Sequence, residues 1–147
     1  MQIHRIAHIS VAVRCLDEAL PFYRDVLGLP LRERRALPER GLNVAFVGVG
    51  ESQIELLEPI DPAGTVARFL ARRGEGLHHV CFEVPDVDAA IAELAGRGIE
   101  LIDRHASPGA QGRVAFLHPR AGHGVLIELQ ETAGAAEHDR RAPGAAP

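Results

Sequence analysis

An internal duplication in the sequence limits what this chain can fold into. Three short segments recur in the same order about 70 residues further on: 8–13 as 79–84, 44–47 as 114–117, and 54–56 as 127–129. Each copy begins an apolar strand with a histidine and places a glutamate inside a later strand. A half of about 60 residues is too small to bury its own sheet, so two copies are expected to share one.

Composition narrows the possible functions. The chain has 147 residues, of which 46% are hydrophobic, and a net charge of −4, which is typical of an ordinary globular protein without a nucleic-acid footprint. All 16 basic residues are arginine, which excludes Schiff-base chemistry and the lysine of a phosphate-binding loop. No apolar run is long enough to cross a membrane, and no signal peptide is recognisable. Cys15 and Cys81 are interpreted as reduced thiols, which favours a cytoplasmic location.

Hydrophobic periodicity predicts the secondary structure. Pro21 fits only the first turn of a helix, so the first helix, within 16–27, is expected to begin near Ala19. The other helices are predicted at 65–73 and 87–97. Strands are predicted at 5–13, 31–36, 43–49, 53–58, 77–84, 99–103, 112–117 and 124–130.

The fold class is therefore α+β: two tandem βαβββ modules forming a curved mixed sheet. We predict a single domain over residues 4–131. It comprises module one at about 4–60, a linker helix at about 61–76 and module two at about 77–131. Residues 132–147 are predicted to be a disordered tail because they are rich in alanine, glycine, proline and charge.

Two histidines and two glutamates occupy matching positions in the copies: His8 with His79, and Glu55 with Glu128. A glutamate among apolar strand residues is costly to bury unless it has a partner, and a metal ion would supply one. The repeat therefore favours one divalent metal held by all four side chains. Such a ligand set suits Co²⁺, Mn²⁺, Ni²⁺, Fe²⁺ or Zn²⁺.

His78 precedes a predicted ligand directly. Adjacent strand residues point to opposite faces, so only one of His78 and His79 is expected to join His8. The repeat aligns His79 with His8, which makes His79 the predicted ligand. His78 is expected either to orient the site from outside the set of ligands or to cap a strand end.

Several motifs resemble the vicinal oxygen chelate superfamily and, within it, the methylmalonyl-CoA epimerase family. They are Gln53-Ile54-Glu55-Leu56-Leu57-Glu58-Pro59, Gly74-Glu75-Gly76-Leu77-His78-His79-Val80, Phe116-Leu117-His118-Pro119 and Gly124-Val125-Leu126-Ile127-Glu128-Leu129. The resemblance covers roughly residues 4–131. It implies paired βαβββ modules, metal ligands at His8, Glu55, His79 and Glu128, an acyl-CoA substrate and a homodimer.

The resemblance also implies an activity. It is the metal-dependent epimerisation of (2R)- and (2S)-methylmalonyl-CoA, by removal of the C2 proton through a metal-stabilised enolate, with Glu128 as the catalytic residue. The chain departs from the family at two positions. Ala7 stands where members often have aspartate, and Val44 stands where some have a glutamate proposed as acid/base. The second proton-transfer group is therefore not identified by the resemblance.

Other functions are compatible with the same pattern. A glyoxalase I-like lactoylglutathione lyase uses the same fold and metal chemistry on a glutathione hemithioacetal. An Fe(II) dioxygenase usually has two histidines and one carboxylate in a larger chain. A metal-free small-molecule-binding protein of this fold typically lacks the ligand set. Nucleic acid and membrane are not expected as partners.

Overall fold

The computed structural model describes residues 1–132; the tail predicted at 132–147 lies outside them apart from its first residue. The strands are β1 (Arg5–Ala12), β2 (Leu31–Leu37), β3 (Leu42–Val49), β4 (Ser52–Pro59), β5 (Gly76–Val84), β6 (Ser107–Pro108), β7 (Gly112–Leu117) and β8 (Ile127–Thr132). The helices are α1 (Leu16–Leu20), α2 (Thr65–Arg73) and α3 (Val87–Gly96), with a π-helix η1 (Pro21–Val26) and a 3₁₀ turn η2 (Pro38–Arg40). Within the described part of the chain, no helix is long and apolar enough to span a membrane.

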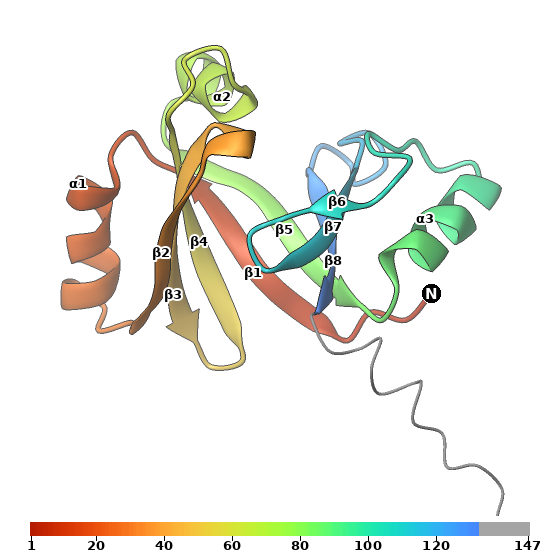
Figure 1. Ribbon diagram of the computed structural model, residues 1–147, viewed down its shortest axis with the longest axis horizontal. Coiled ribbons are helices and arrows are strands. Elements are labelled where there is room, and N and C mark those ends of the chain that lie inside the picture. The colour runs from red at the N-terminus through yellow and green to blue at the C-terminus, as the bar shows by residue number, and fades with distance from the viewer. Residues whose placement is uncertain (133–147) are drawn as a thin grey trace, which may run out of the picture. The chain divides into compact units, whose positions relative to one another are not determined.

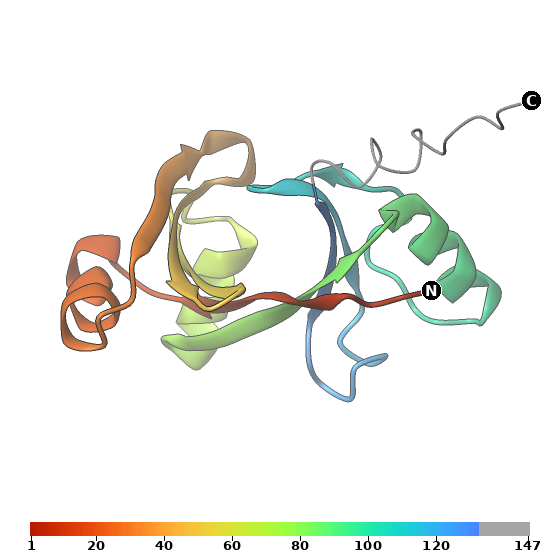
Figure 2. The same cartoon turned by 90° about the horizontal axis from the view of Figure 1, so that it is seen from below.

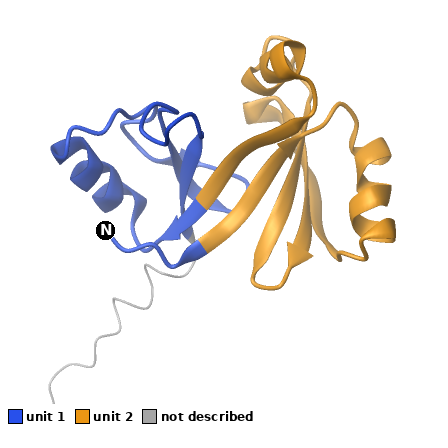
Figure 3. Cartoon of the chain, turned by 180° about the vertical axis from the view of Figure 1, so that it is seen from behind, with its two compact units in different colours: residues 1–5, 82–147 blue, residues 6–81 orange. Residues whose placement is uncertain are grey.

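The chain divides into two compact units, residues 6–81 and residues 1–5 with the chain from 82 onward (Figure 3). In the first unit the strands lie in the order β2-β3-β4-β1-β5. β1 and β4 are parallel, whereas β3 is antiparallel to both β2 and β4. The sheet is therefore mixed, as the duplication predicts.

One face of this sheet is covered by α1 (Figures 1 and 2). Leu16 and Leu20 of the helix pack against Ala45, Val47 and Leu56 of the sheet, and all five are buried. These strand residues alternate with others that point to the opposite face. Helix α1 thus covers the apolar face of the sheet, and the residues of the candidate site lie on the opposite face.

The first helix begins at Leu16, so the predicted start near Ala19 is wrong. The reason is a tertiary cap: Glu58 of β4 accepts a hydrogen bond from the Leu16 backbone N–H at 2.7 Å. Pro21 lies further along, where the α-helix changes into the π-helix η1. A proline has no N–H for the i→i−4 pattern, and the backbone continues with the wider bond from Leu27 N–H to the carbonyl of Phe22.

In the second unit, the strands lie in the order β8-β7-β6, all antiparallel. Helix α3 packs Val87, Ile91 and Leu94 against Ala115 and Leu129 of β7 and β8. An Asp86 carboxylate caps the helix by accepting from the Ala89 N–H at 2.9 Å. This local cap fixes the start of α3 at the predicted residue, 87, and the helix ends one residue before the predicted end, 97.

Two strand predictions in this unit are wrong. Residues 99–103 form only a single bridge, Leu101 to Leu117, because the Asp103 carboxylate and backbone instead bind the main chain of Phe116. The last strand begins at Ile127 rather than at residue 124. His123 and Gly124 both have positive φ, at 54° and 97°, in the turn that precedes it. Such a turn cannot join a sheet ladder.

Candidate metal centre

The candidate site lies on the face of the first unit opposite α1. Strand register brings its residues side by side: Ser10 of β1 is paired with Glu55 of β4, and Glu55 with Phe46 of β3. His8 is two residues from Ser10 and shares its face. Strand alternation, which the sequence shows, thus selects the face, while the parallel pairing of β1 with β4 brings the histidine and the glutamate together.

Three predicted ligands converge within this unit. A nitrogen of His8, a carboxylate oxygen of Glu55 and a nitrogen of His79 all lie within 4.8 Å of one another. Glu55 Oε1 is 3.5 Å from His8 Nε2 and 3.8 Å from His79 Nε2. The three residues are only 3%, 5% and 5% exposed. Two imidazoles and a carboxylate are the donor set that a borderline divalent ion prefers, so the residues fit a metal.

Ser10 joins two of these donors. Its hydroxyl donates to Glu55 Oε1 at 2.6 Å and lies 2.8 Å from His79 Nε2. The serine is fully buried. Sequence reasoning missed this residue, although the duplication contained a signal: Ser10 stands two positions after His8, as Cys81 stands two positions after His79.

The ring of His8 is held by aromatic neighbours. Phe46 lies edge-on to it with ring centroids 5.7 Å apart, and His79 lies edge-on at 5.5 Å. Phe46 is fully buried. The apolar wall removes water from around the donors, which strengthens the attraction of the cluster for a cation.

His78 contacts its neighbour His79 directly. Their Nδ1 atoms are 2.9 Å apart, and one ring must donate to the other. The Phe69 ring of α2 lies edge-on to His78 at a centroid distance of 4.9 Å, and the Arg73 guanidinium stands 5.7 Å over Phe69. His78 therefore contacts both the predicted ligand His79 and the Phe69 ring of α2.

The fourth predicted ligand belongs to the other unit. Glu128 lies in β8 opposite Phe116 of β7 and is only 6% exposed. A buried carboxylate needs a partner or a proton, which is consistent with a functional role. Val44, where some family members have a glutamate, is fully buried in β3 opposite Leu57. It offers no proton-transfer group.

The unduplicated histidines lie elsewhere. His4 is near Glu83, and His118 faces Glu100 at 3.9 Å while its Nδ1 accepts from the Arg120 N–H. His4 and His105 are exposed, and His118 is partly buried. His138 lies outside the described residues.

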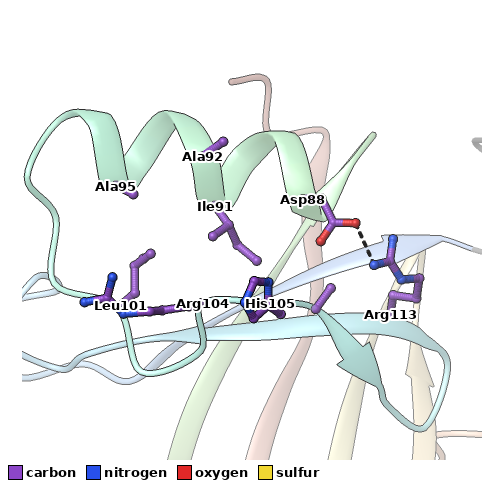
Figure 4. A pocket seen from close by; sticks show the side chains of 9 residues that line it. Asp88, Ile91, Ala92, Ala95, Leu101, Arg104, His105 and Arg113 are labelled. Atoms are coloured by element: carbon purple, nitrogen blue, oxygen red, sulfur yellow. Dashed lines mark hydrogen bonds and ion pairs between the residues drawn. The ribbon is translucent and has the colours of Figure 1, made fainter.

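A groove of about 770 Å³ lies in the second unit between α3 and the segment 101–106 (Figure 4). Ile91, Ala92 and Ala95 line its helical side, and Asp88 binds Arg113 at 2.6 Å at one end. The hydrogen bond from Arg113 lowers the pKa of the Asp88 carboxyl. None of the four predicted ligands is among the residues that line this groove.

The chain is similar to known proteins over most of its length. Residues 7–116 match the family model of the Glyoxalase/Bleomycin resistance protein/Dioxygenase superfamily. The mitochondrial methylmalonyl-CoA epimerase of Mus musculus is 41% identical over 88% of this chain and 74% of its own length. The ethylmalonyl-CoA/methylmalonyl-CoA epimerase of Cereibacter sphaeroides is 35% identical over 88% of this chain and 98% of its own.

Solved structures agree with these sequence matches. A methylmalonyl-CoA epimerase in complex with methylmalonyl-CoA and NH4+ superposes with a TM-score of 0.87 at 35% identity, covering 91% of this chain and 98% of the other. A probable lactoylglutathione lyase of Synechocystis is a more distant relative, at 29% identity over 86% of this chain and 95% of its own. The chain therefore belongs to the glyoxalase/bleomycin resistance/dioxygenase superfamily and, within it, to the methylmalonyl-CoA epimerase family.

Proposed function

We propose that this protein interconverts (2R)- and (2S)-methylmalonyl-CoA by exchanging the proton at C2. The observation that carries the proposal is the buried cluster of His8, Glu55 and His79 in a chain of the epimerase family. The reaction needs a base next to a weakly acidic C–H and a way to stabilise the charge that forms. A divalent cation held by these buried donors would stabilise that charge.

His8, Glu55, His79 and Glu128 would hold the ion. A divalent cation bound there supplies a Lewis acid that lowers the cost of negative charge next to C2. The protein contributes orientation: Ser10 hydrogen-bonds Glu55, and Phe46 packs against the ring of His8. These contacts hold the donors before the substrate arrives, so little reorganisation is needed during the reaction.

Glu128 is proposed as the base. Proton removal from C2 leaves the electron pair of the C–H bond delocalised onto the thioester, and return of a proton to the opposite face inverts C2 without changing the composition of the molecule. Val44 cannot supply the second group, because its side chain is apolar and buried. The second proton-transfer group would be Glu55, a histidine of the pocket or a metal-bound water molecule.

The acyl-CoA substrate is proposed from the same family membership. The homodimer and the cytoplasmic location that the sequence suggested remain predictions. Neither Cys15 nor Cys81 takes part in a disulfide among the described residues, which is compatible with a reducing compartment.

The test is proton NMR of methylmalonyl-CoA in D₂O with metal-stripped protein, before and after addition of Co²⁺. The expected result is metal-dependent loss of the C2 proton signal, faster than its background exchange. Absence of exchange in protein that has bound the metal would contradict the proposed reaction. An assay with methylglyoxal and glutathione then tests the lyase alternative directly.

Glu128→Gln keeps the shape of the side chain and removes its basicity. We expect exchange at C2 to fall by about 10²–10⁴-fold, the usual contribution of a general base. Glu131→Gln is the matched control in the same strand, since Glu131 binds the Val87 N–H at the start of α3. Wild-type exchange by the Glu128 variant would exclude this residue as the base.

A further inference from the structure

We propose that His78 is a positioning residue, which holds the His79 imidazole so that its Nε2 is presented to the metal. The inference rests on the proposed function, because it assumes that His79 is a ligand. It goes further by assigning a role to a residue whose side chain, on an ideal strand, would point away from its neighbour.

Both ring nitrogens of His79 are engaged. Nδ1 lies 2.9 Å from Nδ1 of His78, and Nε2 lies 2.8 Å from Oγ of Ser10. The ring is only about 5% exposed. An imidazole contacted at both nitrogens cannot rotate without losing a hydrogen bond, so its direction is determined by these two neighbours.

The chemistry of ligation then defines what His78 must do. A metal takes the lone pair of Nε2, so the proton of a neutral His79 resides on Nδ1. That N–H needs an acceptor, and the nearest ring nitrogen is Nδ1 of His78. An outer partner of this kind fixes the tautomer and orientation of a metal-bound histidine and raises its basicity.

A histidine suits this position because it serves either tautomer. Ser10 donates its only hydroxyl proton to Glu55, so it accepts from His79 when the proton is on Nε2. His78 then donates from Nδ1. When the proton of His79 is on Nδ1, His78 accepts at Nδ1 and carries its own proton on Nε2. The hydrogen bond between the rings is kept in both cases.

Helix α2 keeps His78 in place. The Phe69 ring packs edge-on against His78, and the Arg73 guanidinium lies over the same Phe69 ring. His78 is half-buried. This backing makes it possible to remove the nitrogen and keep the packing, because a phenyl ring has nearly the shape of an imidazole.

The experiment measures Co²⁺ binding by isothermal titration calorimetry in wild-type protein and in three variants. His78→Phe keeps the ring contact but loses Nδ1, and we expect its Kd to rise about 10–100-fold, as for other outer-sphere partners of histidine ligands. His78→Asn can place an amide group where Nδ1 lies and is expected to bind Co²⁺ nearly as tightly as wild-type protein. His105→Phe, an exposed histidine in the other unit, is the control for the substitution itself.

A spectroscopic readout is independent of affinity. With Zn²⁺ bound, two-bond ¹H–¹⁵N NMR of wild-type protein should show His79 protonated on Nδ1 and protected from exchange. The same proton should exchange rapidly in His78→Phe. If that variant folds poorly, the wild-type spectrum still decides, because an unprotected or absent Nδ1 proton overturns the proposal.

The outcomes separate this inference from the proposed function. Equal Kd values for wild-type protein and a folded His78→Phe variant overturn the positioning role alone. Metal binding without exchange at C2 contradicts the proposed reaction and leaves the role of His78 standing. Wild-type protein that binds neither Co²⁺ nor Zn²⁺ overturns the metal centre and, with it, the role of His78.

Discussion

Ser10→Ala removes the hydroxyl that links two donors of the candidate site. The hydroxyl is fully buried and makes two contacts, at 2.6 Å to Glu55 and 2.8 Å to His79. A hydrogen bond to an ionised carboxylate contributes about 1.5–3 kcal/mol and a neutral one about 1 kcal/mol. We therefore expect the free energy of unfolding to fall by about 2–4 kcal/mol in metal-stripped protein.

The assay is urea unfolding followed by far-UV circular dichroism. With a slope of about 2 kcal/mol/M, the expected loss lowers the urea midpoint by about 1–2 M. Ser52→Ala is the matched control in the same unit, because its hydroxyl makes one bond, at 2.7 Å to the Ile6 carbonyl near the surface. That variant should lose only about 1 kcal/mol.

Added Co²⁺ supplies a second comparison. An ion held by Glu55 and His79 becomes a new partner for the atoms that Ser10 contacts, so the loss caused by Ser10→Ala should shrink when metal is present. A Ser10→Ala variant that is no less stable than Ser52→Ala in metal-stripped protein would refute the reasoning, because the buried bridge would then contribute nothing beyond a surface hydroxyl.

Two further predictions concern the scaffold. Glu58→Ala should lower the free energy of unfolding by about 1–2 kcal/mol, as loss of a helix cap does, while Glu58→Gln, which can still accept from the Leu16 N–H, should lose less in the same urea titration. Asp88 has a lowered pKa because Arg113 donates a hydrogen bond to it, so its contribution is present above the unfolded value of about 3.9 and disappears as pH falls through the folded value. The fall in the urea midpoint from pH 5 to pH 3 should therefore be larger for wild-type protein than for Asp88→Asn. An equal fall in the two proteins would contradict this assignment.

Local patterns predicted elements whose determinants are close in sequence. Helix α2 was predicted at 65–73 and is observed there. Helix α3 begins at the predicted residue and ends one residue before the predicted end. Both predictions succeeded because apolar spacing, and in α3 the Asp86 cap, act within a few residues. The start of α1 was predicted wrongly because its cap, Glu58, is 42 residues away. The strand prediction at 99–103 was wrong for a similar reason, since Asp103 binds the main chain of Phe116 instead of joining a strand ladder.

The sequence alone determined the duplicated plan and the candidate ligands. A side-chain period of two places His8, Glu55 and His79 on definite strand faces, and repetition at one spacing distinguishes them from the chain's other histidines and glutamates. Tertiary structure decided what surrounds them. The parallel register of β1 and β4 sets Ser10 opposite Glu55, and α2 supports the ring that meets His79. The pairing of Ser10 with Glu55 joins residues 45 positions apart in the chain, and no local period encodes which strand lies next to which.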